Sequence, residues 1–335
     1  MSTTNQRLQS AGSTSGLTPA RRGMVAGITL LISASLIVGT GIQTVQATAP
    51  APQPRVSSTS VTVGTFNVHK GSSTLGNSSG RLDRVASEIR RGGFDVVAIQ
   101  EAATTMRGQL NARLRPTYAY SLVGNSRGIN MTGGQIFYRP DVLYAGQTQG
   151  TIPLPTASGP QRFALYQDFY HRASGAHFLF VSVHLSNGDG RAASDRRAAQ
   201  TREMTGRIKA INKAALPMIV GGDMNSNRGG KYVYDAPRQV LQGNGFGEVF
   251  DRAPARVNAS FNTFNRLSRK PPKGGYRPDQ IYVTGDIGVQ YTETMVRLVV
   301  KKKRVGSKVK KVKLYRTPFA SDHNPVRSVV TIPGQ

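Results

Sequence analysis

Residues 217–225 have the sequence Pro217-Met-Ile-Val-Gly-Gly-Asp223-Met-Asn225. The first half is a short apolar run typical of a buried strand, and the two glycines indicate where that strand ends. Because side chains alternate along a strand, Asp223 and Asn225 are expected on one side of the backbone as it leaves the sheet. A carboxylate beside an amide suits a metal-bound water or a phosphate. An Asx turn closing a strand would use the same residues, so this stretch alone leaves both interpretations open.

The same pattern, an apolar strand that ends in polar side chains, recurs along the chain. Strands are predicted at residues 61–68, 94–101, 134–140, 162–169, 178–187, 217–222, 278–283 and 327–332. Helices are predicted at residues 81–91, 104–114 and 195–216, the last with Ser194 as its N-cap. The Gly-, Pro- and Thr-rich connection between residues 140 and 162 is expected to be a loop. Strands and helices joined by short links indicate a layered α/β architecture.

The polar residues at these strand ends form a set with one plausible chemistry. They are four carboxylates, two imidazoles and two amides: Glu101, Asp223, Asp279, Asp322, His184, His323, Asn67 and Asn225. Four carboxylates that converge on one pocket need a cation if all are to stay ionised. Oxygen ligands without sulfur suit Mg²⁺, with Mn²⁺ or Ca²⁺ as alternatives. A histidine beside an aspartate can act as an acid or base near neutral pH, so the set is suited to phosphodiester hydrolysis.

Each of these residues also has an ordinary structural interpretation. Taken alone, His184 is a strand-end histidine, Asp279 is a capping carboxylate, and Asp322-His323 is a turn before a strand. The functional interpretation therefore depends on the ordered set and not on any single motif.

The order of six short motifs resembles that of the endonuclease/exonuclease/phosphatase superfamily, whose fold is deoxyribonuclease-I-like. The motifs are Thr-Phe-Asn67, Ile-Gln-Glu101, Val-His184-Leu, Gly-Asp223-Met-Asn225, Asp279-Gln-Ile and Ser-Asp322-His323. The resemblance covers about residues 61–333. It implies a four-layer sandwich, in which two mixed β-sheets are flanked by helices and the site lies across one end.

The resemblance also implies a role for each residue. Glu101 would ligate the metal, with Asn67 assisting and Asp322 as a further contact. Asp223 and Asn225 would orient or activate water and bind the scissile phosphate.

The two histidines match the family's histidines on the substrate. His323 would contact the phosphate with Asp279 as its carboxylate partner, and His184 would lie toward the leaving group. Tyr138 and Arg162 occupy positions where some members contact substrate. The motifs leave open whether His323 or Asp223 is the general base.

Charge points to a polyanionic partner. The chain has 44 Lys+Arg against 17 Asp+Glu, a net charge of +27. Residues 297–316 contain no acid, and Gly306-Ser307 between Val-containing runs predicts a β-hairpin. We expect this hairpin to hold polyanionic substrate through Lys301, Lys302, Lys303, Lys310 and Lys311. The alternative is that these lysines only protect an edge ribbon from aggregation.

The N-terminal residues predict export. Residues 23–54 contain no charged side chain, basic residues precede them, and Val45-Gln-Ala47 offers a cleavage site. Residues 1–47 are thus predicted to be an export signal or an uncleaved anchor, residues 48–60 a flexible linker, and residues 61–335 one catalytic domain. In both cases the domain is expected outside the cell. With 0 Cys, disulfides, thiolate metal sites and cysteine nucleophiles are excluded.

These observations predict a secreted, metal-dependent phosphodiesterase, most simply an extracellular nuclease acting on DNA or RNA. One alternative is a sphingomyelinase-like or inositol-phosphate hydrolase on the same fold, for which anionic lipid or a phosphate ester would be the partner. A lipid enzyme would be expected to expose an aromatic or apolar hairpin, whereas this chain has 0 Trp and offers lysines. A non-catalytic polyanion-binding surface protein is the other alternative. No protein partner is implied, and a monomer is expected.

Overall fold

The computed structural model describes residues 57–71, 75, 76, 78–102, 104–121, 134–156, 161–226 and 235–334. The predicted export segment and most of the predicted linker lie outside the described residues. Thr59 and Ser60, assigned to the linker from sequence, already belong to the first strand. Within the described part of the chain, no helix combines the length and the apolar composition needed to cross a membrane.

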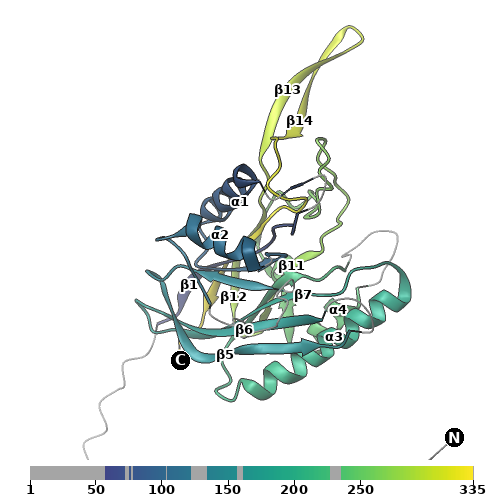
Figure 1. Cartoon of the computed structure of the whole chain (residues 1–335). Coiled ribbons are helices and arrows are strands. Elements are labelled where there is room, and N and C mark those ends of the chain that lie inside the picture. Colours follow the sequence, from purple (N-terminus) through teal and green to yellow (C-terminus); the bar gives the residue numbers. More distant parts are fainter. Residues whose placement is uncertain are drawn as a thin grey trace, which may run out of the picture. The chain divides into compact units, whose positions relative to one another are not determined.

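Two mixed sheets form the body of the protein (Figure 1). Among the described residues, the first sheet has the strand order β10 (Ala255–Val257), β12 (Gly288–Thr294), β15 (Val326–Ile332), β1 (Thr59–Asn67), β2 (Val96–Gln100), β4 (Gln135–Tyr138), β3 (Ala119–Tyr120). The second has the order β5 (Leu143–Leu154), β6 (Arg162–His171), β7 (His177–His184), β8 (Met218–Asp223), β11 (Asp279–Thr284), β9 (Phe246–Glu248). The pairs β1–β2 and β7–β8 are parallel, and β15, β4 and β11 run antiparallel to their neighbours in these sheets.

Strand β5 corrects the prediction of a loop between residues 140 and 162. It pairs with β6 from Leu143 to Leu154, with an irregularity between Ala145 and Gln149. Its glycines and Pro153 weaken the sequence signal of a strand. Because β5 lies at the edge of its sheet, one side of its backbone needs no ladder partner, and a proline is tolerated there.

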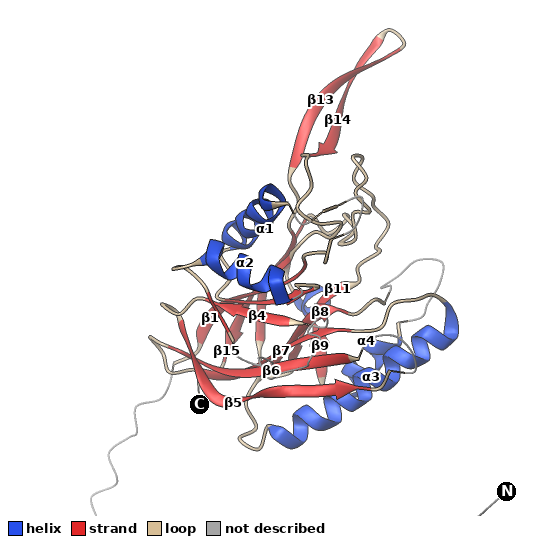
Figure 2. Ribbon diagram, in the orientation of Figure 1, coloured by secondary structure: helices blue, strands red, loops and turns tan. Residues whose placement is uncertain are grey.

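Helices cover the outer face of each sheet (Figure 2). They are α1 (Ser79–Gly92) and α2 (Thr104–Leu114) on the first sheet, and α3 (Gly190–Ile211) and α4 (Ala236–Gly243) on the second. The short α5 (Val249–Arg252) instead contacts β11 and β12 and places Val249 in the cluster between the sheets. Helix α1 begins at Ser79, ahead of the predicted start at Arg81, because the Ser78 side chain accepts a hydrogen bond from the Arg81 N–H as the N-cap. The prediction for α3 was wrong at both ends. The helix starts at Gly190, leaves Ser194 buried in its interior, and stops at Ile211.

Three hydrophobic clusters separate four layers, which confirms the predicted sandwich. Between the sheets lie residues such as Val63, Phe180 and Ile281. Val85, Ile89 and Leu110 of α1 and α2 pack on the outside of the first sheet, against strand residues such as Val97 and Phe137. Met204, Ile208 and Leu241 of α3 and α4 pack on the outside of the second, against strand residues such as Val181 and Val220.

The sheets approach each other closely near one end of β8. A Cβ atom added at Gly221 would lie 3.3 Å from the Cβ of Ala98 and 3.5 Å from the carbonyl oxygen of Gly64. The contact with Ala98 is tighter than usual, so that neighbour would have to move slightly, whereas the distance to Gly64 is an ordinary contact. The small residues therefore permit β8 to contact β1 and β2 just below the ends of these strands.

The predicted hairpin is present as a separate two-stranded sheet, which Figure 1 shows projecting from the body. It consists of β13 (Leu298–Val305) and β14 (Lys308–Tyr315), joined at Gly306-Ser307 as the sequence indicated. At its base, the buried Tyr315 receives a hydrogen bond from Asn324 Nδ2 (2.8 Å), and Arg297 pairs with Glu88 of α1 (2.5 Å).

Candidate active site

The register of the two sheets brings the predicted site residues to one end of the sandwich. Asn67 pairs with Gln100, the residue before Glu101. In the second sheet, Asp223 pairs with His184 on one side and Asp279 on the other. Asn67, His184 and Asp223 are the last residues of β1, β7 and β8, and Glu101 directly follows β2. Because β11 runs antiparallel to β8, Asp279 lies at the start of its strand instead of its end. The sheets thus meet with their polar termini together.

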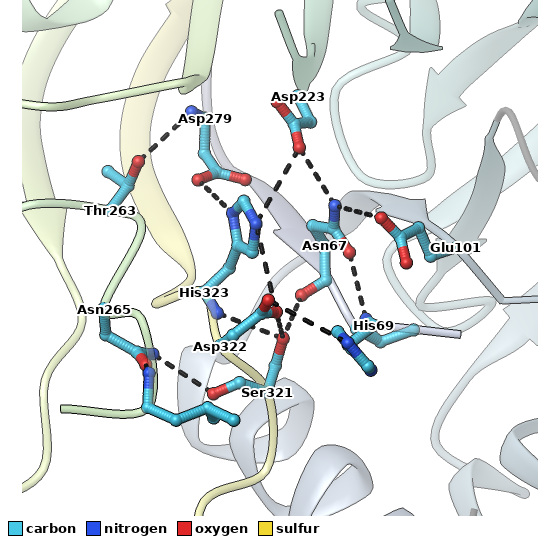
Figure 3. Close-up of polar contacts among 12 residues, drawn as sticks. Asn67, His69, Glu101, Asp223, Thr263, Asn265, Asp279, Ser321, Asp322 and His323 are labelled. Carbon is cyan, nitrogen blue, oxygen red and sulfur yellow. Dashed lines mark hydrogen bonds and ion pairs between the residues drawn. The ribbon is translucent and has the colours of Figure 1, made fainter. Parts of the chain in front are cut away.

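The Asn67 amide joins the two sheets. Its Nδ2 donates to Glu101 Oε1 (3.1 Å) and to Asp223 Oδ2 (2.9 Å), as Figure 3 shows. Its Oδ1 accepts the His69 N–H (3.0 Å), which fixes the orientation of the amide. Glu101 Oε2 accepts the Lys70 N–H (2.9 Å). Glu101 itself has φ of 64°, a left-handed conformation that is uncommon outside glycine and that turns its carboxylate into the site.

His323 is held between carboxylates. Its Nδ1 lies 2.8 Å from Asp279 Oδ2, and its Nε2 lies 4.0 Å from Asp223 Oδ2 and 3.9 Å from Asp322 Oδ1. Asp279 is fixed in turn, because its backbone N–H donates to Thr263 Oγ1 (3.2 Å). His184 Nε2 lies 3.7 Å from the same Asp223 oxygen. Two imidazoles therefore converge on one buried carboxylate.

The mutual arrangement shifts the pKa values of these groups. Burial acts to raise the pKa of Asp223, but His184, His323 and the Asn67 hydrogen bond outweigh it and lower that pKa. For Glu101, burial is likewise outweighed by His184 and by the Lys70 and Asn67 hydrogen bonds, so its pKa is lowered. Burial alone would lower the pKa of His323, but its surrounding carboxylates, Asp279 first, raise it to about 10.

The Gly-Asp-Met-Asn motif closes its strand with the Asx turn that was one interpretation of this stretch. The Asn225 backbone N–H donates to Asp223 Oδ1 (2.8 Å), the contact of an Asx turn, and its Nδ2 donates to Leu185 O (2.9 Å). The turn leaves Asp223 Oδ2 directed toward Asn67 and the histidines. Arg162 also lies near the site, where the negative charges of Glu101 and Asp223 favour its charged form. Burial outweighs them, so the pKa of Arg162 is lowered overall.

Residues 64–323 match the Endonuclease/Exonuclease/phosphatase family. The chain belongs to this family. Members are metal-dependent phosphoester hydrolases, so the chain carries the fold and the residue set of such an enzyme. A search of curated proteins returned no match.

Solved structures of the endonuclease/exonuclease/phosphatase fold resemble this chain over most of its length. A family protein from Bacteroides thetaiotaomicron has a TM-score of 0.66 at 22% identity, over 82% of this chain and 98% of that chain. Mannosyl-6-phosphatase from the same organism has a TM-score of 0.60 at 20% identity (81% and 99% covered). D. rerio TDP2, complexed with single strand DNA product, has 0.57 at 17% (81% and 98% covered). At these identities the likeness shows the shared fold.

The donor set of this family member fits a hard divalent cation. Glu101 and Asp322 offer carboxylate oxygens, whereas Asn67 directs its Nδ2 at Glu101 and its Oδ1 at the His69 N–H. Asp223, Asp279 and His323 form a second set, with ligand atoms within 4.8 Å of one another. In that set, Asp279 and His323 already bind each other, an arrangement that orients an imidazole. The side with Glu101 is therefore the better place for a cation.

Tyr138 is the predicted site residue that the structure places elsewhere. It pairs with Val96 at the start of β2, whereas Glu101 follows the other end of that strand. Its ring packs on Phe169, with centroids 5.0 Å apart. The prediction of a substrate contact was therefore wrong. The predicted lysines also lie outside this cluster, exposed on the hairpin.

Three residues that support the site were not predicted as part of it. Ser321 Oγ donates to Asn67 O (2.7 Å) and accepts the His323 N–H (3.1 Å), which joins the last loop to β1. His69 Nε2 lies 4.0 Å from Asp322 Oδ2, and its place two residues after Asn67 was a usable signal. Arg81 had no such signal. Its buried guanidinium donates to backbone carbonyls of Val68 (2.7 Å), His69 (3.0 Å), Gly76 (2.6 Å) and Ala320 (3.1 Å).

Proposed function

We propose that this protein is a secreted, divalent-metal-dependent nuclease that hydrolyses phosphodiester bonds of DNA or RNA. The observation that carries the proposal is the Asn67 amide, which holds Glu101 and Asp223 together beside a histidine oriented by Asp279. Phosphoester hydrolysis needs these parts in one place: ionised carboxylates, a positioned imidazole and donors for phosphoryl oxygens. The uncharged segment after the N-terminal arginines supports export, with the catalytic domain outside.

The proposed roles follow from the contacts. Asp223 has a lowered pKa and is therefore ionised at neutral pH, so it can accept a hydrogen bond from the attacking water and draw off its proton. Its Oδ1 accepts the Asn225 N–H, whereas its Oδ2 accepts the Asn67 amide and is the oxygen that both imidazoles approach, so we assign this task to Oδ2. His323 has a raised pKa and Nδ1 bound to Asp279, so its protonated Nε2 is suited to donate to a phosphoryl oxygen. We therefore assign Asp223 as the base in preference to His323.

The remaining residues would act on charge and on the leaving group. Asn67, Glu101 and Asp322 would hold a divalent cation, Mg²⁺ by the hardness of their oxygens, with Mn²⁺ or Ca²⁺ as alternatives. Such an ion would neutralise charge on the phosphate. Arg162 could add a cationic contact on the side of the second sheet. His184, on the far side of Asp223 from Asp279, is placed to protonate the leaving oxygen.

A nucleic acid substrate is favoured by the basic hairpin. Lys301, Lys302, Lys303, Lys310 and Lys311 are all exposed, and residues 294–321 contain no acid. A solved relative in complex with a single strand DNA product shows that the fold accommodates such a ligand. The hairpin also exposes Val300 (59%) and Val309 (62%), which keeps a lipid phosphodiester as the second candidate.

The test is a substrate panel. The mature protein is incubated with plasmid DNA, RNA, sphingomyelin dispersions, inositol phosphates and a sugar phosphate, with Mg²⁺ or with EDTA. We expect cleavage of DNA or RNA with Mg²⁺ and none with EDTA. Hydrolysis confined to sphingomyelin or to a phosphomonoester would replace the proposal. Activity that survives EDTA would remove its metal dependence.

A further inference from the structure

A groove of about 810 Å³ lies between the basic hairpin and the loop that leads from β10 to β11. On one side it is lined by Lys311 and Lys313 of β14. On the other it is lined by Lys270 and Lys273, with Phe261 and Pro272 supplying apolar surface. None of these lining residues belongs to the acidic cluster. Of the four lysines, only Lys311 was predicted from the sequence to bind substrate.

The groove carries positive charge that no acidic residue of its own two chain segments balances. The two chain segments that form it, residues 252–278 and 294–321, contain no Asp or Glu at all. Across the ribbon, Lys302 faces Lys311 and Lys303 faces Lys310, pairs in which like charges repel. Lys273 Nζ lies 5.1 Å from the Phe261 ring centroid, so an aromatic face is its partner here. Such charge is unfavourable for the free protein and becomes favourable when an anion binds.

Both walls of the groove are tied to residues beside His323. Within the loop, Phe261 and Lys273 form an isolated β-bridge. Phe264, three residues after Phe261, has its ring centroid 4.9 Å from that of His323. On the other wall, Tyr315 ends β14 and accepts a hydrogen bond from Asn324, the neighbour of His323. The Tyr315 N–H donates to Arg269 O (2.8 Å), which joins the walls. A polymer bound with one phosphate at His323 could therefore continue along this groove.

We propose that the groove is an extended subsite for a nucleic acid strand, holding backbone phosphates several nucleotides from the scissile one. The inference rests on the proposed nuclease function and deepens it. Lysines on both walls suit phosphates that follow one another along a strand, and the half-buried Pro271 and Pro272 suit sugars. The recess argues against a membrane, because Phe261 is only 6% exposed and could not insert into lipid. The enzyme should accordingly prefer long polymers to short ones.

Binding of labelled single strands of about 6 and about 20 nucleotides, measured by fluorescence anisotropy in EDTA, tests the groove without cleavage. The groove variant carries Lys270→Gln, Lys273→Gln and Lys313→Gln. We expect its Kd for the longer strand to rise by about 10- to 30-fold and its Kd for the shorter strand to rise much less. The slope of log Kd against log salt should fall by about 2, at roughly 0.7 per lost phosphate contact on a single strand.

A control variant removes the same charge elsewhere. Arg202→Gln, Arg207→Gln and Lys213→Gln lie on or just after α3, on the outer face of the second sheet, and are exposed. The control should change the Kd by less than about threefold. A Lys→Arg version of the groove variant should bind as the original does. Equal weakening by groove and control variants, or an unchanged Kd in the groove variant, would overturn the proposal.

Two further outcomes separate this inference from the proposed function. If the groove lysines govern binding of the long strand but the protein cleaves no nucleic acid with Mg²⁺, the subsite is supported and the proposed nuclease function is wrong. If the protein cleaves DNA and the groove variant binds and cleaves as the original does, the nuclease function is supported and the subsite is wrong. Sedimentation with phosphatidylglycerol vesicles covers the lipid case. If the groove lysines governed vesicle binding and not strand binding, the groove would be a lipid site and the proposal wrong.

Discussion

The active-site cluster and the basic hairpin hold charged groups in opposite ways. In the cluster, Asp223 is buried, and each of its oxygens is contacted by Asn67, Asn225 or an imidazole. On the hairpin, eight basic side chains are exposed over two short strands without an acid, and some face one another directly. The cluster is organised before any ligand arrives, whereas the charge of the hairpin is balanced only by something outside the chain. The proposed chemistry and the proposed substrate capture are thus assigned to separate parts of this molecule.

The largest effect is expected at the centre of the cluster. Asp223→Asn keeps the shape of the side chain and removes its charge, so the fold should persist while kcat falls by roughly 10³-fold or more. The measurement is the cleavage rate on DNA with Mg²⁺, with circular dichroism as a check of folding. Asp286→Asn, an exposed aspartate after β11, is the matched control and should leave kcat unchanged. Comparable activity in the two variants would remove Asp223 from the chemistry.

A second effect concerns the scaffold beneath the cluster. Arg81→Lys keeps the positive charge but loses the planar fork that contacts four carbonyls, so buried acceptors are left unpaired. We expect a loss of about 2–4 kcal/mol in the free energy of unfolding, measured by urea denaturation. The neighbouring Arg84→Lys, at a half-buried side chain that donates to the Phe319 carbonyl (3.1 Å), should cost less than about 1 kcal/mol. A stability loss no greater for Arg81 than for Arg84 would contradict this account.

Neutralising the hairpin should affect substrate capture and leave the cluster intact. With Lys301, Lys302, Lys303, Lys310 and Lys311 changed to Gln, kcat/KM on DNA at low salt should fall by about 10- to 100-fold. The reference is kcat/KM on a small phosphodiester dye. The quantity to compare between variants is the ratio of kcat/KM on DNA to kcat/KM on the dye. If the ratio does not change, the lysines serve only to prevent edge association, the alternative interpretation of this ribbon.

The smallest effect is a pH dependence of the metal-free protein. The pKa of His323 is raised to about 10 from an ordinary 6.5, so the folded state holds its proton more tightly than the unfolded state. The associated stability is fully present below pH 6.5 and is lost as pH rises toward 10. Nitrogen NMR of the ring in EDTA should show it protonated at pH 8, and urea midpoints should fall from pH 6.5 to pH 10. A ring that titrates near 6.5 would show that its carboxylates do not act as described.

The comparison also explains what the sequence could predict. Strand ends are marked locally by periodicity and glycine, so Glu101, Asp223 and His323 could be found without coordinates. Tyr138 failed because β4 runs antiparallel to β2, and strand direction decides which end of a strand faces the site. Strand β5 was missed because an edge strand tolerates the Pro and Gly that a central strand excludes. The contacts of Arg81 could not be predicted, since every residue carries a backbone carbonyl and one of the acceptors, Ala320, is 239 residues away.

The close approach of the sheets at Gly221 and Ala98 has a consequence for tuning this enzyme. Glu101 belongs to one sheet and Asp223 to the other, so their separation depends on how tightly the sandwich is packed there. A larger side chain at residue 221 would move the two acids apart without replacing either of them. The rate of such an enzyme could thus be adjusted gradually from the hydrophobic interior, at a position that no substrate ever touches.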